Sequence, residues 1–345
     1  MSALSERTAE RRSLPTRPVV LLLLVVVLAA ICLASIAIGA RSIPLGHVLD
    51  ALFSPGRAPD DELAIVRGLR IPRTVLGLMA GASIGLAGAL MQGLTRNPLA
   101  DPGLLGVSAG ASFGIVAAVA LLHVGSFYGY VWFAILGAIA ASAVVYLLGG
   151  LGQGGATPVK LALAGVGVTL LLGSLTSAIV LSSQAALDRY RFWSAGSLAG
   201  QDAGVLWRVA PFLLVGAVLG LSAAPALNSL ALGDRMARAL GRRVGLVRVT
   251  GALAVTLLAA ASVAVTGPIV FVGLVVPHLV RMLTGPDYRL LLPFTMILSP
   301  ALLLAADIIG RIVIRPSEMQ VGVVVAFLGA PFFIALVRRR SPAEL

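Results

Sequence analysis

The sequence predicts an all-α membrane protein with about ten transmembrane helices. Of its 345 residues, 59% are hydrophobic and only 12% are charged, and the mean hydropathy is +1.01. A soluble domain carries about 25% charged residues, so this chain has too few polar side chains to cover a water-facing surface. Uncharged apolar runs recur along the chain, and each is long enough to cross the hydrocarbon core as a helix.

The expected spans follow the limits of these apolar runs. Basic residues precede the first run, as in a signal peptide, but the run exceeds the roughly 7–15 residues of a signal h-region and is taken as a retained span. The eighth span is short and is broken by Pro277. The expected spans are residues 19–40, 74–94, 104–123, 128–148, 161–183, 205–223, 247–266, 269–283, 290–306 and 320–337.

Arginine placement orients these spans. Ten crossings leave both termini on one side, together with the loop that follows the sixth span. Arginines cluster in both tails and in that loop, which the positive-inside rule assigns to the cytoplasm. We therefore expect a multi-pass protein of the cytoplasmic membrane, with a cytoplasmic tail at 1–18, a single transmembrane domain at 19–338 containing a cytoplasmic loop at 224–246, and a cytoplasmic tail at 339–345.

Several function classes are disfavoured by composition. The net charge of +12 does not indicate nucleic-acid binding, because the arginines lie between spans instead of forming a stripe with interleaved aromatics. Cys32 is the only cysteine, which excludes a disulfide or thiolate metal site within one chain. His278 follows a proline, and a hydrogen bond to a neighbouring helix is favoured over metal ligation. No metal site is expected.

Glycines concentrate within two spans, in GLMAGASIGLAGAL (77–90) and GVSAGASFG (106–114). Small residues at spacings of three or four allow helix backbones to approach closely inside a membrane. A phosphate-binding loop is disfavoured, because no strand precedes these glycines and no lysine follows them. We therefore expect tight helix packing here.

No aspartate or glutamate lies within the expected spans, and Asp307 is placed at the edge of the ninth. Ion-coupled carriers and pumps need such groups inside the membrane, so a stand-alone secondary transporter or channel is the weaker alternative. An intramembrane enzyme would need a catalytic set, and the sequence has no HExxH, P-loop or nucleophile triad. The chain is expected to be neither an enzyme nor a cofactor carrier, and to use the energy of a partner.

Two loops stand out. In QGLTRNPLADPG (92–103) two prolines break the helix, and Asn97 and Asp101 can bond the amides so released. Such backbone persists near membrane depth only where protein or a water-filled cavity satisfies it. In LALGDRMARALGRR (230–243) the pattern is helical, and Gly233 and Gly241 bracket a short helix with apolar Leu230, Met236, Ala237 and Leu240. This helix lies either on the anionic leaflet or against a partner protein.

Four stretches of the chain, at residues 70–114, 230–241, 267–293 and 321–339, resemble the FecCD-type permeases, the membrane subunits of ATP-binding-cassette (ABC) importers for ferric siderophores, haem and cobalamin. The resemblance implies a type II ABC importer permease fold. It also implies a homodimer or a pair of homologous permeases, two cytoplasmic ATPases that hold ATP and magnesium, and an external substrate-binding protein. A ferric siderophore is the expected cargo, with haem and cobalamin left open.

The resemblance also implies residue roles. Asn97, Pro98, Leu99, Thr157 and Pro158 would form a gate at the cytoplasmic end of the passage, although a plain helix connector is an equal alternative for any one of them. Arg70, Arg73 and Arg311 would pair with glutamates of the binding protein; contact with lipid phosphate is the alternative. ATPase coupling would fall to Leu232, Gly233, Asp234, Ala237, Leu240 and Gly241.

Overall fold

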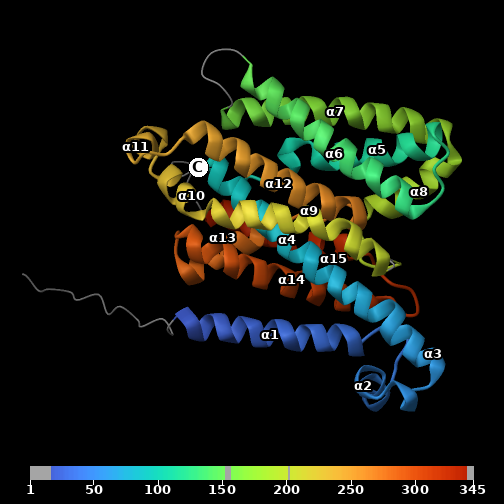
Figure 1. Cartoon of the computed structure of the whole chain (residues 1–345). Coiled ribbons are helices and arrows are strands. Elements are labelled where there is room, and N and C mark those ends of the chain that lie inside the picture. The colour runs from blue at the N-terminus through green and yellow to red at the C-terminus, as the bar shows by residue number, and fades with distance from the viewer. Residues whose placement is uncertain (1–16, 152–156, 201–202, 340–345) are drawn as a thin grey trace, which may run out of the picture.

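The computed structural model describes residues 17–151, 157–200 and 203–339, and every regular element in these ranges is helical (Figure 1). Seven of the described helices are long and apolar enough to cross a membrane, and three shorter apolar helices complete the set of ten. The expected fold class is confirmed. The ten helices are α1 (Arg17–Ala37), α4 (Ile71–Thr95), α5 (Val107–Leu121), α6 (Phe127–Gly150), α7 (Pro158–Ser182), α9 (Ala203–Ser222), α12 (Val244–Thr266), α13 (Val272–Thr284), α14 (Tyr288–Val313) and α15 (Val321–Arg339).

Short helices lie at both ends of the bundle. In Figure 1, α2, α3 and α8 lie at one end, and α10 and α11 lie at the other. Only α11 was expected from the sequence, where Gly233 and Gly241 bracket it; the other short helices were not predicted. Their bounds are α2 (Leu45–Phe53), the 3-10 turn η1 (Pro55–Arg57), α3 (Asp60–Leu63), the π-helical η2 (Ala64–Arg70), the 3-10 turn η3 (Pro102–Leu105), α8 (Gln184–Ser194), α10 (Ala224–Ala231) and α11 (Asp234–Ala239).

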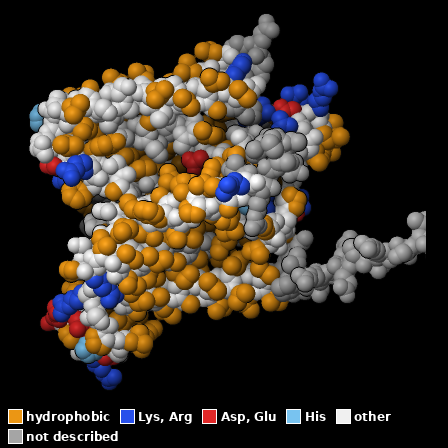
Figure 2. Space-filling view, turned by 180° about the vertical axis from the view of Figure 1, so that it is seen from behind, with side chains coloured by type: hydrophobic (Ala, Val, Ile, Leu, Met, Phe, Trp, Pro, Cys, Tyr) orange, Lys and Arg blue, Asp and Glu red, His pale blue; other side chains and the backbone are white. Residues whose placement is uncertain are grey.

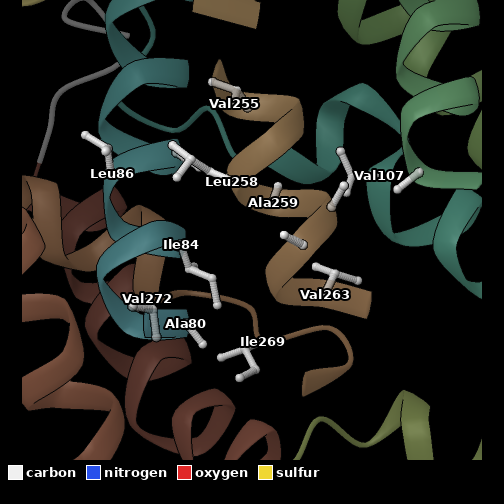
Figure 3. Close-up of a cluster of buried hydrophobic side chains, with 14 of the residues drawn as sticks. Ala80, Ile84, Leu86, Val107, Val255, Leu258, Ala259, Val263, Ile269 and Val272 are labelled. Atoms are coloured by element: carbon white, nitrogen blue, oxygen red, sulfur yellow. The ribbon is translucent and has the colours of Figure 1, made fainter. Parts of the chain in front are cut away.

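Helices α4 and α12 form the centre of the bundle. In the most apolar part of α12, 72% of residues are buried, against 6% in α1 and 17% in α7, which are therefore peripheral. Figure 3 shows Ile84 of α4 on the side that faces Ala259 and Val263 of α12, with Ile269 below them. This central layer fixes the positions of the loops at both ends.

Glycines allow α4 to pack closely against its neighbours. A Cβ atom at Gly81 would lie 2.8 Å from the Pro300 nitrogen of α14, and one at Gly88 would collide with the Gly273 backbone of α13. On the other side of the bundle, Gly110 of α5 meets the backbone of Gly137 of α6 in the same way. The predicted close packing at both glycine-rich stretches is confirmed.

Adding volume at this contact should weaken the fold. Gly85→Val is expected to destabilise the protein by about 1–3 kcal/mol or more, because its Cβ would collide with Ser299 of α14. Gly46→Val in α2 is the matched control, since no atom lies within 4 Å of a Cβ there. Thermal unfolding of both variants in detergent would test this, and equal melting temperatures would contradict it.

The ends of the bundle are polar and its middle is apolar. On the face seen in Figure 2, hydrophobic side chains cover the middle of the molecule, and most Lys and Arg side chains lie toward its two ends. Helix α1 begins, and α15 ends, at the end that carries α10 and α11 (Figure 1). The expected tails at 1–18 and 339–345 lie almost entirely outside the described residues.

Candidate coupling, gate and outer sites

Helix α11 is set off from its neighbours by two glycines. Gly233 before it has φ +98° and Gly241 after it has φ +77°, and this left-handed region of backbone space favours glycine. The expectation that these glycines bracket a short helix is confirmed. The break lets α11 project from the end of the bundle (Figure 1).

Some of the side chains that were expected to contact an ATPase are exposed, and others are buried. Leu232, Met236 and Leu240 are 66%, 51% and 56% exposed. Met236 and Leu240 are about one turn apart on α11 and its C-cap, whereas Leu232 lies before the break at Gly233, at the end of α10. Ala237 is fully buried, as is Leu230. An approaching protein would therefore meet Leu232 and Leu240 but not the Ala237 side chain. The residues predicted for ATPase coupling did not include Met236. Its position in the sequence, midway between Leu232 and Leu240, could have indicated it.

Asp234 points back toward the bundle. Its Oδ2 accepts a hydrogen bond from Arg248 Nη2 of α12 at 2.8 Å, and its Oδ1 lies 3.2 Å from Arg96 Nη2 at the end of α4. Gly233 lies beside the same arginine, because a Cβ atom there would be 3.7 Å from Arg96 Nη1. The carboxylate is thus engaged within the chain.

Helix α10 is anchored separately. Asn228 Nδ2 donates to Asp287 Oδ1 at 2.6 Å, and Asn228 Oδ1 accepts from the Tyr288 amide at 2.9 Å. Asp287 is the N-cap of α14. The loop at 224–246 is therefore tied to the α13–α14 connection as well as to α4 and α12, which the sequence did not reveal.

The turn between α4 and α5, residues 96–101, is hereafter the gate turn. It opens with Arg96 in the left-handed conformation (φ +52°). Asn97 Oδ1 accepts from the Leu99 amide at 2.9 Å, and Asp101 Oδ1 accepts from the Gly103 amide at 2.7 Å. These are the side-chain contacts predicted for Asn97 and Asp101. Burial raises the pKa of the Asp101 carboxyl, and the hydrogen bond from Gly103 opposes the shift.

The two predicted gate segments lie next to each other. A cavity of about 370 Å³ separates the gate turn from the first turns of α7. Thr157 caps α7, accepting from the Lys160 amide at 3.4 Å, and Pro158 is the first residue of the helix. The cavity is lined by Thr95, Asn97, Ala100 and Leu104 on one side and by Val159, Ala162, Leu163 and Val166 on the other.

At the opposite end, two of the predicted docking arginines share one carboxylate. Arg73 Nη2 donates to Asp307 Oδ1 at 2.7 Å, and Arg311 Nε donates to Asp307 Oδ2 at 2.9 Å. Arg73 also donates to Glu318 at 2.6 Å, and Arg311 to the Ser35 carbonyl at 2.7 Å. The ninth span, expected to end at residue 306, instead continues to Val313. Pairing with two arginines neutralises the Asp307 carboxylate in the part of α14 beyond the expected limit.

Arg70 completes this outer network. Its Nη1 donates to the carbonyls of Ile36 at 2.9 Å and Ala37 at 2.6 Å, which are among the last carbonyls of α1 and have no partner within that helix. Arg70 is 5% exposed and Arg311 is 1% exposed. The geometry therefore favours a structural role for these arginines, and docking through them stays a prediction.

Exposed arginines do lie on α8, at the same end. Arg189 and Arg191 are exposed, and the Arg189 guanidinium carbon lies 5.7 Å from the centroid of the Tyr130 ring. Arg189 and Tyr130, with Trp193 and Gln320, line a cavity of about 410 Å³ that opens beside α8.

Taken together, the ten apolar helices, the projecting α11 and the cavity at the gate turn define a multi-pass membrane permease. The chain belongs to the FecCD transport family, which matches residues 24–339.

Similar proteins cover nearly the whole chain. The ferric enterobactin transport system permease protein FepD of Escherichia coli (strain K12) is 48% identical over 93% of this chain and 94% of its own length. The hemin transport system permease protein HmuU of Yersinia pestis is 38% identical over 79% of this chain and 82% of its own. A solved metal-chelate type ABC transporter in an inward-facing conformation covers 94% of this chain and all of its own, with a TM-score of 0.82 and 30% identity.

Proposed function

We propose that the chain is the permease subunit of an ATP-driven importer and carries a ferric siderophore across the cytoplasmic membrane. The observation that carries the proposal is the 48% identity to a ferric enterobactin permease over 93% of the chain. Permeases named for siderophore and ferric citrate import are 39% and 40% identical. The hemin and cobalamin permeases are 38% identical, ten percentage points below the ferric enterobactin permease, so a ferric siderophore is the favoured cargo.

Energy would enter through a separate ATPase. The chain carries no phosphate-binding loop, so ATP and magnesium would be held by a pair of cytoplasmic ATPase subunits. The exposed apolar side chains of Leu232, Met236 and Leu240 form the coupling stripe, which would seat in a groove of that partner. In this orientation α11 and both termini would lie on the cytoplasmic side.

The passage would form between two permease copies, either identical or homologous. Leu163, Leu170 and Leu171 of α7 are 70%, 67% and 61% exposed, and Phe327 of α15 is 74% exposed. A mainly apolar cavity of about 600 Å³ opens beside α15. A second permease would cover these faces and enclose the passage, whereas α1 would face membrane lipid.

An external binding protein would deliver the chelate at the end that carries α2 and α8. Arg73 and its partner Glu318 are the members of the outer network nearest to solvent, with side chains 12% and 31% exposed. We propose that Arg73 contributes to docking from this position, and that Arg70 and Arg311 hold the surface in place beneath it.

A transport assay tests the proposal. Reconstituted with its ATPase and binding protein in liposomes, the permease is expected to import iron-labelled ferric enterobactin only when ATP and binding protein are both present. Uptake should exceed that of haemin or cobalamin by about tenfold or more, the discrimination available when polar contacts differ between ligands. ATP-independent uptake would favour a secondary transporter, and absence of uptake of any chelate would contradict the proposal.

A further inference from the structure

We infer that Asp234 is a positioning residue that links α11 to the gate turn through Arg96. The inference rests on the proposed function, since it names the contact through which movement of α11 would reach the gate. It assigns Asp234 a role inside the permease instead of at the ATPase surface, and it adds Arg96 and Arg248 to the residues that act in coupling.

Asp234 stands between α11 and the ends of two long helices. It is the first residue of α11, and its two carboxylate oxygens face arginines from different helices. Arg248 belongs to α12, and Arg96 is the C-cap of α4. Without a carboxylate between them, the two guanidinium groups would repel each other. Asp234 therefore holds the ends of α4 and α12 together while it tethers α11 to both.

The two contacts are unequal. Arg248 Nη2 donates a hydrogen bond to Oδ2 at 2.8 Å. Oδ1 is buried and accepts no hydrogen bond within the described residues, although Arg96 Nη2 lies 3.2 Å away. The Arg248 side chain is 19% exposed and that of Arg96 is 42% exposed. The hydrogen-bonded Arg248 is thus the fixed anchor, and the looser, more solvated Arg96 is the contact that can change.

Arg96 is also the point at which α4 becomes the gate turn. Its φ of +52° lies in a region that residues other than glycine rarely occupy. The Asn97 amide, one residue on, donates to the Gln92 carbonyl at 3.2 Å, and the Asn97 side chain holds the Leu99 amide. Asn97 in turn lines the cavity that faces α7. A displacement of the Arg96 side chain therefore acts directly where the gate turn departs from the helix.

The buried and exposed faces of α11 fit this arrangement. Met236 and Leu240 face outward, where a partner would bear on them, whereas Asp234 and Ala237 face the permease. A partner that shifts the outer face would move Asp234 as part of the same short helix. Because Arg248 stays bonded, the movement would change the distance to Arg96.

The experiment reads the gate directly. In a Cys32→Ser background, Leu99→Cys provides a single thiol in the gate turn for a membrane-impermeant maleimide. The permease is studied with its ATPase and binding protein in lipid nanodiscs, with and without ATP plus vanadate. We expect nucleotide to change the labelling rate by about tenfold in this parent protein, a coupling of ordinary size.

The variants should separate coupling from folding. Asp234→Asn and Arg96→Gln are expected to reduce the nucleotide effect to less than about twofold while ATP hydrolysis continues. The nucleotide effect in the double variant should be no smaller than in either single variant, because the two residues act through one contact. Arg96→Lys, which keeps the charge, should retain most of the effect. Arg242→Gln is the matched control, because Arg242 is an exposed arginine of the same loop.

The possible results are distinguishable. If nucleotide changed the labelling rate equally in the parent and in the Asp234→Asn variant, the inference would be overturned and the proposed function would stand. So would additive losses in the double variant. A parent whose labelling ignores nucleotide, and which imports no ferric enterobactin, would contradict the proposed function and the inference together.

Discussion

Replacing Asp307 with alanine is expected to destabilise the protein by about 3–5 kcal/mol, the cost of removing one partner from a buried ion pair. Its carboxylate is fully buried and accepts hydrogen bonds from both Arg73 and Arg311. Arg311 is 1% exposed, so its charge would have no water to replace the lost partner. Arg73 would keep only Glu318 as a carboxylate partner.

Thermal unfolding of the purified permease in detergent measures this effect. The matched control is Asp61→Ala, which removes a carboxylate from the exposed pair of Arg41 and Asp61, whose side chains are 57% and 59% exposed. That variant should melt close to the parent protein. If Asp307→Ala and Asp61→Ala shifted the melting temperature equally, the outer network would not be a source of stability.

Introducing a charge at Met236 is expected to abolish transport without unfolding the permease. Met236 lies at the middle of the coupling stripe and is 51% exposed, so the folded permease tolerates an aspartate there. In the complex the same carboxylate would be desolvated at the centre of an interface. Truncation of central interface residues costs about 2 kcal/mol or more, which corresponds to about a 30-fold loss of affinity.

Copurification with the ATPase and ATP-driven uptake of ferric enterobactin are the measurements. Met236→Asp should lose both, whereas Met236→Leu, which keeps an apolar side chain of similar size, should retain both. Equal melting temperatures for the two variants would exclude misfolding as the cause. Uptake by Met236→Asp at the rate of the parent would show that the ATPase does not use this face.

Membrane spans were predictable because lipid imposes a strict requirement of length and apolarity. The length of the ninth helix was less predictable: α14 continues past residue 306 to Val313, and a sequence window cannot see that Asp307 meets two arginines. The short helices α2, α3, α8 and α10 were missed for a related reason. Tertiary contacts help to hold them: Asn228 of α10 is bonded to Asp287, and Val48 and Ala51 of α2 pack in a small cluster with Val66.

The gate turn was predictable in its local chemistry. Prolines end helices, and the side chains of Asn97 and Asp101 satisfy amides two residues further on, which depends only on neighbours in sequence. The orientation of α11 was not predictable in this way. Its six residues are too few for a periodic signal to decide which face is buried. Arg96 and Arg248 decide it, and only the fold brings them to Asp234.

The hydrogen bonds from Arg70 and Arg311 to the last carbonyls of α1 have a consequence for the order of membrane insertion. The carbonyl of Ser35 is bonded by Arg311, 276 positions later in the chain, and α1 packs mainly along α14. During synthesis α1 therefore enters the bilayer long before the residues that fix it exist. Arg70 can bond the carbonyls of Ile36 and Ala37 early. The Ser35 carbonyl gains its partner only after α14, the ninth membrane helix, has been inserted. A chain released before that helix would keep its first helix loosely attached and exposed to membrane proteases.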